Sequence, residues 1–201
     1  MLFHYHFWTP YVEETEKFYE DNGFYISQRI GKYQGKFQSF NPPLIWDDFR
    51  NKNILFRIIE AKKGNGNITF GYGKKIMFDH IGFLVSKEEH DKICDNAKVL
   101  SWKAEISDRR TFIKTPYEFD IELQTHSDVV DLDDNTGKLE RITIMIKSEG
   151  LEKDLTELFG KEVQSVQSVI GEKVTIKEAI IKGFLTMNTV DPNGVNVFNC
   201  V

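Results

Sequence analysis

The sequence of 201 residues has little cysteine, no cluster of basic residues and no long apolar segment. Its two cysteines, Cys94 and Cys200, cannot form a disulfide framework and lack CxxC spacing, which favours a reducing, intracellular compartment. A formal net charge of −5 argues against a nucleic-acid partner. No apolar run approaches the roughly 20 residues that span a bilayer, and the N-terminus lacks the pattern of a signal peptide. We therefore expect a cytoplasmic protein with no nucleic-acid and no membrane partner.

A strand–helix pattern occurs near the N-terminus, within a composition of 40% apolar and 28% charged residues that is usual for globular proteins. Residues 3–8 are rich in aromatic side chains, which favours a strand. Thr9-Pro10 has the residue types of a helix start, and Asn22-Gly23 those of a helix end. The strands expected after this helix span residues 24–30, 35–40 and 53–63, and the paired prolines in 41–53 predict an insertion loop.

The same order of elements recurs further along the chain. Residues 78–85 have the pattern of a strand. Ser86 is followed three residues later by Glu89, which is a capping-box pattern, and it predicts a helix over 87–97. The strands expected after this second helix span residues 103–108, 110–115 and 119–125. Both segments therefore predict the order β-α-β-β-β.

A fainter third copy covers residues 139–199, after an acidic and polar linker at 127–138. One such unit exposes a sheet face that it cannot bury alone. We therefore expect an α+β fold in which two βαβββ modules pair into one curved mixed sheet, with outer helices and a cavity between the modules. The expected divisions are modules 1–75 and 76–128, which form the domain 1–128, and a third, degenerate βαβββ module over 138–201.

Histidine is scarce, with five residues in the chain, yet two of them lie on the first predicted strand. Strand alternation points His4 and His6 the same way. His80 lies six residues before Ser86, and His4 lies six residues before Pro10. Alignment of the two helix starts therefore makes His4, rather than His6, the predicted counterpart of His80.

Two glutamates, Glu60 and Glu122, lie inside strand patterns, where Glu is disfavoured unless it has a partner or faces water. With His4 and His80 they would form a set of two nitrogens and two oxygens, which suits Zn²⁺, Ni²⁺, Fe²⁺, Co²⁺ or Mn²⁺. We therefore expect a divalent metal ion, with coordination positions left open for a substrate. Glu60 is equally explained as a solvent-facing residue of an edge strand.

These segments resemble the vicinal oxygen chelate superfamily, which includes glyoxalase I, methylmalonyl-CoA epimerase, extradiol dioxygenases, and the fosfomycin- and bleomycin-resistance proteins. The resemblance rests on His4 followed by FYEDNGF, on DHIGFLV around His80, and on RTFIKTPYEFDIEL around Glu122. It implies paired βαβββ modules around a metal held by these three residues. Glu60 would be the fourth ligand of the glyoxalase and epimerase branch. Without Glu60, the set is the two-histidine-one-carboxylate type of the dioxygenases and fosfomycin-resistance proteins.

The resemblance implies a metal-dependent enzyme that acts on a small-molecule substrate with vicinal oxygens. We expect isomerase or lyase chemistry in which the metal stabilises an enediolate-like anion. Glu60 or Glu122 would move the proton. His6 would either act beside the metal as a base or donor or be a partly buried histidine of the strand. The enzymatic alternatives are an extradiol-type dioxygenase and a fosfomycin-resistance-like transferase. The alternative from another class is a drug-binding antibiotic-resistance protein without catalysis.

Several residues leave alternatives open. Arg109, Arg110 and Lys114 would either bind an anionic substrate or be solvated charges at strand ends. Trp46 and Phe49 would cap the pocket, pack the insertion loop down or meet another subunit. The remaining histidines outside the two first strands are expected at the surface.

The third copy departs from the ligand pattern. Arg141 stands where its first strand would carry a ligand, and Phe198 where its last strand would. In the second copy, Tyr117-Glu118 replaces the Asp-Gly that the superfamily usually has after the turn proline. The third copy is therefore expected to be metal-free and to add a sheet face or to form a homodimer with another chain.

Overall fold

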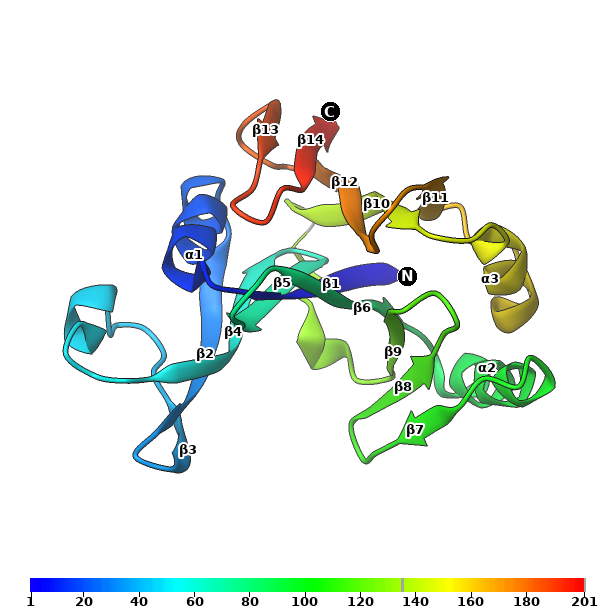
Figure 1. Cartoon of the computed structure of the whole chain (residues 1–201), viewed down its shortest axis with the longest axis horizontal. Coiled ribbons are helices and arrows are strands. Elements are labelled where there is room, and N and C mark those ends of the chain that lie inside the picture. Colours follow the sequence, from blue (N-terminus) through cyan, green and yellow to red (C-terminus); the bar gives the residue numbers. More distant parts are fainter. Residues whose placement is uncertain (135, 201) are drawn as a thin grey trace.

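The computed structural model describes residues 1–134 and 136–200, which form two mixed β-sheets and three α-helices (Figure 1). The nine-stranded sheet has the order β3-β2-β4-β5-β1-β6-β9-β8-β7, and the five-stranded sheet has the order β11-β10-β12-β14-β13. The first sheet contains β1 (Leu2–Thr9), β2 (Tyr25–Tyr33), β3 (Lys36–Ser39), β4 (Leu55–Lys63), β5 (Gly66–Tyr72), β6 (Met77–Leu84), β7 (Ala104–Ile106), β8 (Arg110–Lys114) and β9 (Asp120–Gln124). The second contains β10 (Lys138–Ile146), β11 (Val166–Ile170), β12 (Thr175–Lys182), β13 (Asn188–Val190) and β14 (Asn196–Cys200). The helices are α1 (Val12–Asp21), α2 (Lys87–Val99) and α3 (Leu151–Phe159), with short 3₁₀ turns η1 (Trp46–Phe49) and η2 (Ser127–Val129). None of the helices described is long and apolar enough to cross a membrane.

Two βαβββ modules meet at the centre of the nine-stranded sheet. Their first strands, β1 and β6, pair antiparallel, and each first strand pairs in parallel with the last strand of its own module, β5 or β9. Helices α1 and α2 follow these first strands in the chain. The predicted α+β fold of paired modules is therefore confirmed. The helix starts differ in detail: Ser86 and Glu89 form the predicted capping box, whereas α1 begins at Val12, because Thr9 still belongs to β1.

The sequence did not predict β5, and this omission misplaced Glu60. Its segment GNITFGY contains two glycines, which lower the strand propensity, and its structure depends on pairing with β1 on one side and β4 on the other. The expected strand at 35–40 is only the short edge strand β3. Glu60 therefore lies on the penultimate strand of the first module, not on the last.

The second sheet repeats the centre of the first sheet rather than one complete module. Its strands follow the order and directions of β5-β1-β6-β9-β8, with β10 antiparallel to β12 at the centre. The register shifts of β1 after Leu2 and His6 recur in β10 after Leu139 and Thr143. In this alignment Arg141 takes the place of His4. By the same pairing, Glu178 takes the place of His80, and Phe198 takes the place of Glu122. The second sheet thus consists of two shortened modules, one of which has no helix.

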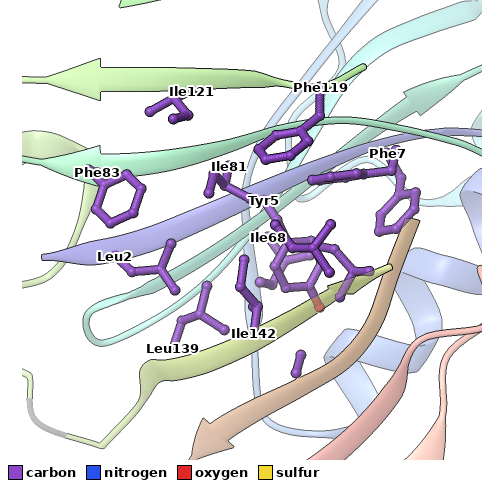
Figure 2. Packing of buried hydrophobic residues seen from close by; sticks show 14 of the residues in the cluster. Leu2, Tyr5, Phe7, Ile68, Ile81, Phe83, Phe119, Ile121, Leu139 and Ile142 are labelled. Atoms are coloured by element: carbon purple, nitrogen blue, oxygen red, sulfur yellow. The ribbon is translucent and has the colours of Figure 1, made fainter. Parts of the chain in front are cut away.

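The two sheets pack against each other through an apolar layer (Figure 2). Leu2, Tyr5 and Phe7 of β1 point into this layer and meet side chains of β10 that include Leu139 and Ile142. Because side chains alternate along a strand, His4 and His6 point to the opposite face of the same sheet. The second sheet therefore covers the back of the sheet whose front carries the histidines.

The insertion loop is held down by a buried ion pair on the helix side of the sheet. Arg29 of β2 donates to both carboxylate oxygens of Glu16 of α1, at 2.6 and 2.7 Å. Its other nitrogen donates to the carbonyl oxygens of Phe40 and Leu44, and Trp46 donates to Glu16 at 2.8 Å. The ring of Phe49 is buried in the same region. The loop is therefore packed down, and neither Trp46 nor Phe49 lines the cavity described below.

A second buried polar group joins the C-terminal sheet to the first module. Tyr5 donates to the hydroxyl of Tyr19 at 2.7 Å, and Tyr19 donates to Asp191 at 3.2 Å. Asp191 also accepts from the backbone N–H groups of Asn193 and Val195, which closes the hairpin turn between β13 and β14. Burial raises the pKa of Asp191. This turn is therefore anchored to α1 by specific hydrogen bonds as well as by apolar packing.

Candidate metal centre

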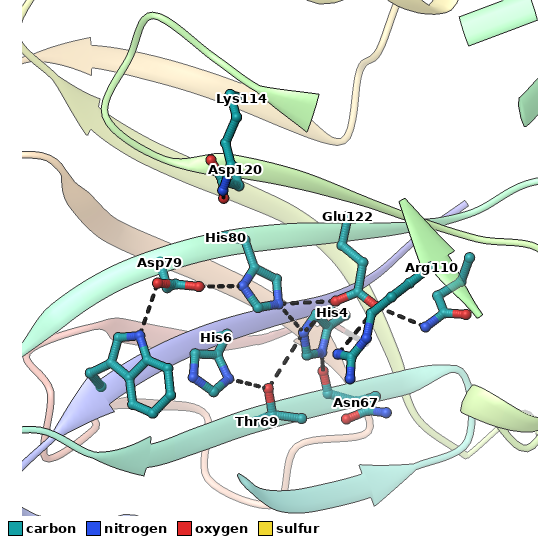
Figure 3. A network of polar contacts seen from close by, with 12 residues as sticks. His4, His6, Asn67, Thr69, Asp79, His80, Arg110, Lys114, Asp120 and Glu122 are labelled. Carbon is teal, nitrogen blue, oxygen red and sulfur yellow. Dashed lines mark hydrogen bonds and ion pairs between the residues drawn. The ribbon is translucent and has the colours of Figure 1, made fainter. Parts of the chain in front are cut away.

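Three side chains from neighbouring central strands converge on one point of the nine-stranded sheet (Figure 3): His4 of β1, His80 of β6 and Glu122 of β9. All three are buried. The two Nε2 atoms are 2.9 Å apart, and Glu122 Oε2 lies 3.0 Å from His80 Nε2 and 3.7 Å from His4 Nε2. Within residues 1–134 and 136–200, no other His, Cys, Asp and Glu side chains form such a group of three.

The outer ring nitrogens show where each imidazole carries its proton. His80 Nδ1 donates to Asp79 Oδ2 at 2.7 Å, and His4 Nδ1 donates to the carbonyl oxygen of Asn67 at 3.2 Å. In the neutral rings, both Nε2 atoms therefore keep a lone pair, and these lone pairs face each other and the Glu122 carboxylate. Acceptors cannot satisfy one another, whereas a cation between them satisfies all three. The donor set thus fits a metal ion.

The spacing of the donor atoms fits one face of a coordination sphere. Ligand atoms about 2.1 Å from an ion, at right angles to each other, are about 3 Å apart. The separations of 2.9 and 3.0 Å match this value, and 3.7 Å corresponds to a wider angle. Two imidazoles and one carboxylate on one face are the set that non-haem Fe²⁺ oxygenases use, with the other positions open.

The electrostatics of the site favour the metal-binding forms of His4 and Glu122, whereas His80 holds a proton that a metal ion would displace. Burial lowers the pKa of His4 to about 4. Burial alone would raise the pKa of Glu122, but the hydrogen bond from His80 and the adjacent imidazoles lower it to about 2. The pKa of His80 is raised, because its contacts with Asp79 and Glu122 outweigh the effect of burial. At neutral pH, His4 is therefore neutral and Glu122 is charged, and a metal ion would take the place of the proton between His80 and Glu122.

Asp79 is the residue of this site that sequence reasoning missed. As the neighbour of His80 on a strand, it should point to the other face. The register between β1 and β6 shifts between His80 and Phe78, so Asp79 is the extra residue of a β-bulge. A bulge re-aims a side chain, and here Asp79 reaches both His80 Nδ1 and the indole N–H of Trp8. Alternation alone could not have revealed this contact.

Glu60 does not join the three ligands, although it lines the same cavity. It accepts a hydrogen bond from Ser27 Oγ at 2.7 Å and forms an ion pair with Lys62 at 3.1 Å. Its carboxylate is therefore already compensated by β2 and by its own strand. The structure places it beside the centre, not in it.

Thr69 of β5 holds the place that a fourth ligand would take. It lies two residues beyond the cross-strand partner of His4, as Glu122 lies two residues beyond that of His80. Its hydroxyl is 3.4 Å from His4 Nε2 and 2.7 Å from His6 Nδ1. Because a threonine hydroxyl is a weak metal ligand compared with a carboxylate, the first module offers one strong candidate ligand, and the second module offers two.

His6 lies beside the three ligands, on the face that strand alternation predicts. Its ring stacks on that of His80, with centroids 5.0 Å apart and planes within 2°. Its Nδ1 contacts Thr69, and its Nε2 is buried without a hydrogen-bond partner among the described residues.

A cavity of about 940 Å³ lies over the three ligands and is lined by both modules. Its walls include Phe3, Trp8 and Phe112, and the exposed Phe37 of β3 lies at its border. Phe112 meets the ring of His80 edge-on at 5.1 Å. The cavity therefore offers aromatic surface next to the candidate metal ligands, which suits a planar, partly apolar substrate.

The three basic residues for which anion binding was one alternative differ in their surroundings. Arg109 donates to both oxygens of Asp128, at 2.7 and 2.8 Å, and Lys114 is paired with acidic side chains of neighbouring strands. Arg110 lies at the cavity wall, with Nη1 4.0 Å from Glu122 Oε1. The charges of Arg109 and Lys114 are thus already compensated within the protein.

Comparison with known proteins identifies the fold. No protein-family model matches the sequence, and no curated protein matches it. Among solved structures, 2,2′,3-trihydroxybiphenyl 1,2-dioxygenase from Sphingomonas wittichii has a TM-score of 0.65 at 11% identity, over 100% of this chain and 90% of that one. Homoprotocatechuate 2,3-dioxygenase from Arthrobacter globiformis has a TM-score of 0.61 at 10% identity, over 99% and 79%. A hypothetical protein from Staphylococcus aureus has a TM-score of 0.60 at 8% identity, over 99% of both chains.

These similarities define the class of fold. The chain has the vicinal oxygen chelate fold, as the sequence resemblance predicts. Several of the similar structures are dioxygenases, one of them an extradiol ring-cleaving dioxygenase. The present chain carries a candidate two-histidine-one-glutamate centre between its two complete modules.

We expect replacement of Asp79 by Ala to weaken metal binding by about 10–100-fold, because partners that orient ligating histidines have effects of this size. Asp79 fixes the tautomer and the ring orientation of His80 through Nδ1. The measurement is competitive Zn²⁺ titration against a chelating dye. Asp120→Ala is the matched control, because Asp120 lies beside His80 on β9 but pairs with Lys114. Equal losses in the two variants would contradict the orienting role.

Proposed function

We propose that this protein is a metal-dependent dioxygenase that cleaves an aromatic substrate with two adjacent hydroxyl groups. The proposal rests on one observation: His4, His80 and Glu122 converge, and no fourth strong candidate ligand among the described residues joins them. Such a set leaves several positions of one ion open, as binding of both substrate oxygens and dioxygen requires. The dioxygenases among the similar structures support this choice.

The position of Glu60 favours this proposal over the isomerase or lyase chemistry expected first. In the glyoxalase and epimerase branch of the resemblance, Glu60 would be the fourth ligand and a proton carrier. Here its carboxylate is engaged by Ser27 and Lys62, and Thr69 holds the equivalent place near the ligands. Among residues 1–134 and 136–200, the three candidate ligands thus have no second carboxylate beside them that could leave the ion and carry a proton.

The residues around the centre suggest how the protein would take part in the reaction. Fe²⁺, when bound, would supply the redox chemistry with dioxygen. His4, His80 and Glu122 would hold the ion, and Asp79 would keep His80 oriented. His6 Nε2 would accept the proton of a substrate hydroxyl, because this atom is buried, unpartnered and next to the ligands. Phe3 and Phe112, which line the cavity, would exclude water from the aromatic ring of the substrate.

Oxygen uptake tests the proposal. The protein is loaded anaerobically with one equivalent of Fe²⁺, a panel of catechols is added, and air-saturated buffer is mixed in. We expect consumption of one O₂ per catechol, with loss of the catechol absorbance.

A parallel experiment tests isomerase chemistry by offering a 2-oxoaldehyde and a thiol to Ni²⁺- and Zn²⁺-loaded protein. Turnover of the thiol adduct without oxygen uptake on any catechol would overturn the proposal in favour of glyoxalase-like chemistry. Tight binding of catechols without turnover by the Fe²⁺ protein would favour a binding protein.

A further inference from the structure

One cationic side chain of the cavity has no acidic partner. Arg57 of β4 lines the cavity, and no carboxylate among residues 1–134 and 136–200 lies within ion-pair distance of it. By contrast, Lys62 is paired with Glu60, and Arg109 is paired with Asp128. Arg57 is therefore the cavity's cation with the least compensation inside the protein.

Arg57 is held in place by stacking on an aromatic ring. Its guanidinium carbon lies 4.5 Å from the ring centroid of Trp8. A guanidinium group that stacks on an indole face keeps the N–H groups of its edge free, and this edge matches a carboxylate with two parallel hydrogen bonds. The stack thus fixes the cation without using its hydrogen-bond donors.

The backbone around this stack is shaped to allow it. The pairing of β2 with β4 shifts between Ile30 and Gly31, so that Arg57 is the extra residue of a bulge and lines the cavity beside Ile58. Gly71 of β5 supplies the space: a Cβ there would lie 2.4 Å from the Arg57 carbonyl oxygen and 2.6 Å from the Trp8 ring. A bulge and a glycine therefore both serve the contact between Arg57 and Trp8.

The stack is connected to the candidate metal centre. Trp8 Nε1 donates to Asp79 Oδ1 at 2.8 Å, and the other oxygen of Asp79 accepts from His80. The Trp8 ring also meets the ring of His6 edge-on, with centroids 4.7 Å apart. A substrate whose two oxygens bind a metal ion held by His4, His80 and Glu122 would thus extend past His6 and Trp8 towards Arg57.

We propose that Arg57 is a specificity-determining residue that binds an anionic substituent, a carboxylate, on the substrate. The inference rests on the proposed function, since it places the two adjacent oxygens of the same molecule at the metal. The substrate class is a vicinal diol of an aromatic ring with a short acidic side chain. Arg57 binds the end of the substrate that does not react, and it takes no part in proton or electron transfer.

The test uses two probes with the same catechol ring, 3,4-dihydroxyphenylacetate and its methyl ester, of which only the first carries a negative charge on its side chain. Binding of each to the Zn²⁺-loaded full chain is measured by isothermal titration calorimetry, so that no turnover occurs. We expect the carboxylate to bind about 10–100-fold more tightly than the ester, the size typical of a charged hydrogen bond. In Arg57→Gln this preference should fall to within about threefold, with little change for the ester. In Arg57→Lys, part of the preference should remain.

Arg141→Gln is the matched control, because it removes the same charge from an exposed position on β10, outside this cavity. We expect it to leave the preference unchanged. Equal affinity of the wild type for both probes, or an unchanged preference in Arg57→Gln, overturns the inference and leaves the proposed function standing. Metal content is measured in the same samples. Probe binding that is unaffected by removal of the metal with a chelator overturns the proposed function instead, whatever the effect of Arg57.

Discussion

Replacement of His80 by Ala or of Glu122 by Gln is expected to abolish stoichiometric metal binding. Each change removes one of three strong donors whose atoms lie 2.9 to 3.7 Å apart. Loss of a direct ligand should exceed the roughly 100-fold upper range for partners that merely orient ligands. The measurement is metal content by elemental analysis after dialysis against trace Fe²⁺ or Zn²⁺, followed by affinity titration. Circular dichroism shows whether the variants remain folded.

Two control variants separate ligands from neighbours. Glu60→Gln should keep full metal content, because Glu60 is engaged by Ser27 and Lys62. His90→Ala should also keep it, because His90 lies on α2 and contacts Thr111 and Asp91. Full metal content in both His80→Ala and Glu122→Gln would contradict the proposed three-ligand centre. A loss in Glu60→Gln as large as theirs would restore the four-ligand set.

Replacement of Glu16 by Ala should destabilise the protein by about 3–5 kcal/mol, the usual cost of leaving one partner of a buried ion pair alone. Arg29 and Glu16 are both almost fully buried, with side chains 4% and 1% exposed, so an unpaired Arg29 could not be solvated without local unfolding. Trp46 would lose its hydrogen-bond acceptor at the same time. The measurement is the free energy of unfolding from urea denaturation, with and without metal.

The chain offers a matched control for this experiment. Glu13 on the same helix also forms a bidentate ion pair, with Arg50, but this pair lies at the surface, with side chains 37% and 52% exposed. Glu13→Ala should cost no more than about 1 kcal/mol. A double variant that replaces Glu16 and Arg29 by Leu and Met should recover much of the stability, since apolar pairs can replace buried charges. Similar costs for Glu16→Ala and Glu13→Ala would contradict the importance of burial.

Local signals account for the parts of this protein that the sequence predicted. The Ser86 capping box marks the end of a strand and the start of a helix, and the aromatic residues near the N-terminus mark the first strand. Both signals depend on neighbouring residues alone. Counting back six residues from the predicted helix starts, Pro10 and Ser86, selects His4 and His80, although α1 begins only at Val12. The strand pattern around Glu122 adds the carboxylate. The structure brings these three side chains together, and the predicted pairing of two βαβββ modules is confirmed.

Contacts between distant strands decided the rest. Strand β5 has two glycines and is defined by its pairing with β1 and β4, so Thr69, and not Glu60, faces the ligands. Bulges turned Asp79 towards His80 and Arg57 towards the cavity, against the alternation that a regular strand would follow. By itself the sequence determined the paired modules and offered four candidate donors, His4, Glu60, His80 and Glu122, because periodicity and capping are local. Tertiary structure alone decided which donors share the centre, because strand order and register arise from pairing between segments far apart in the chain.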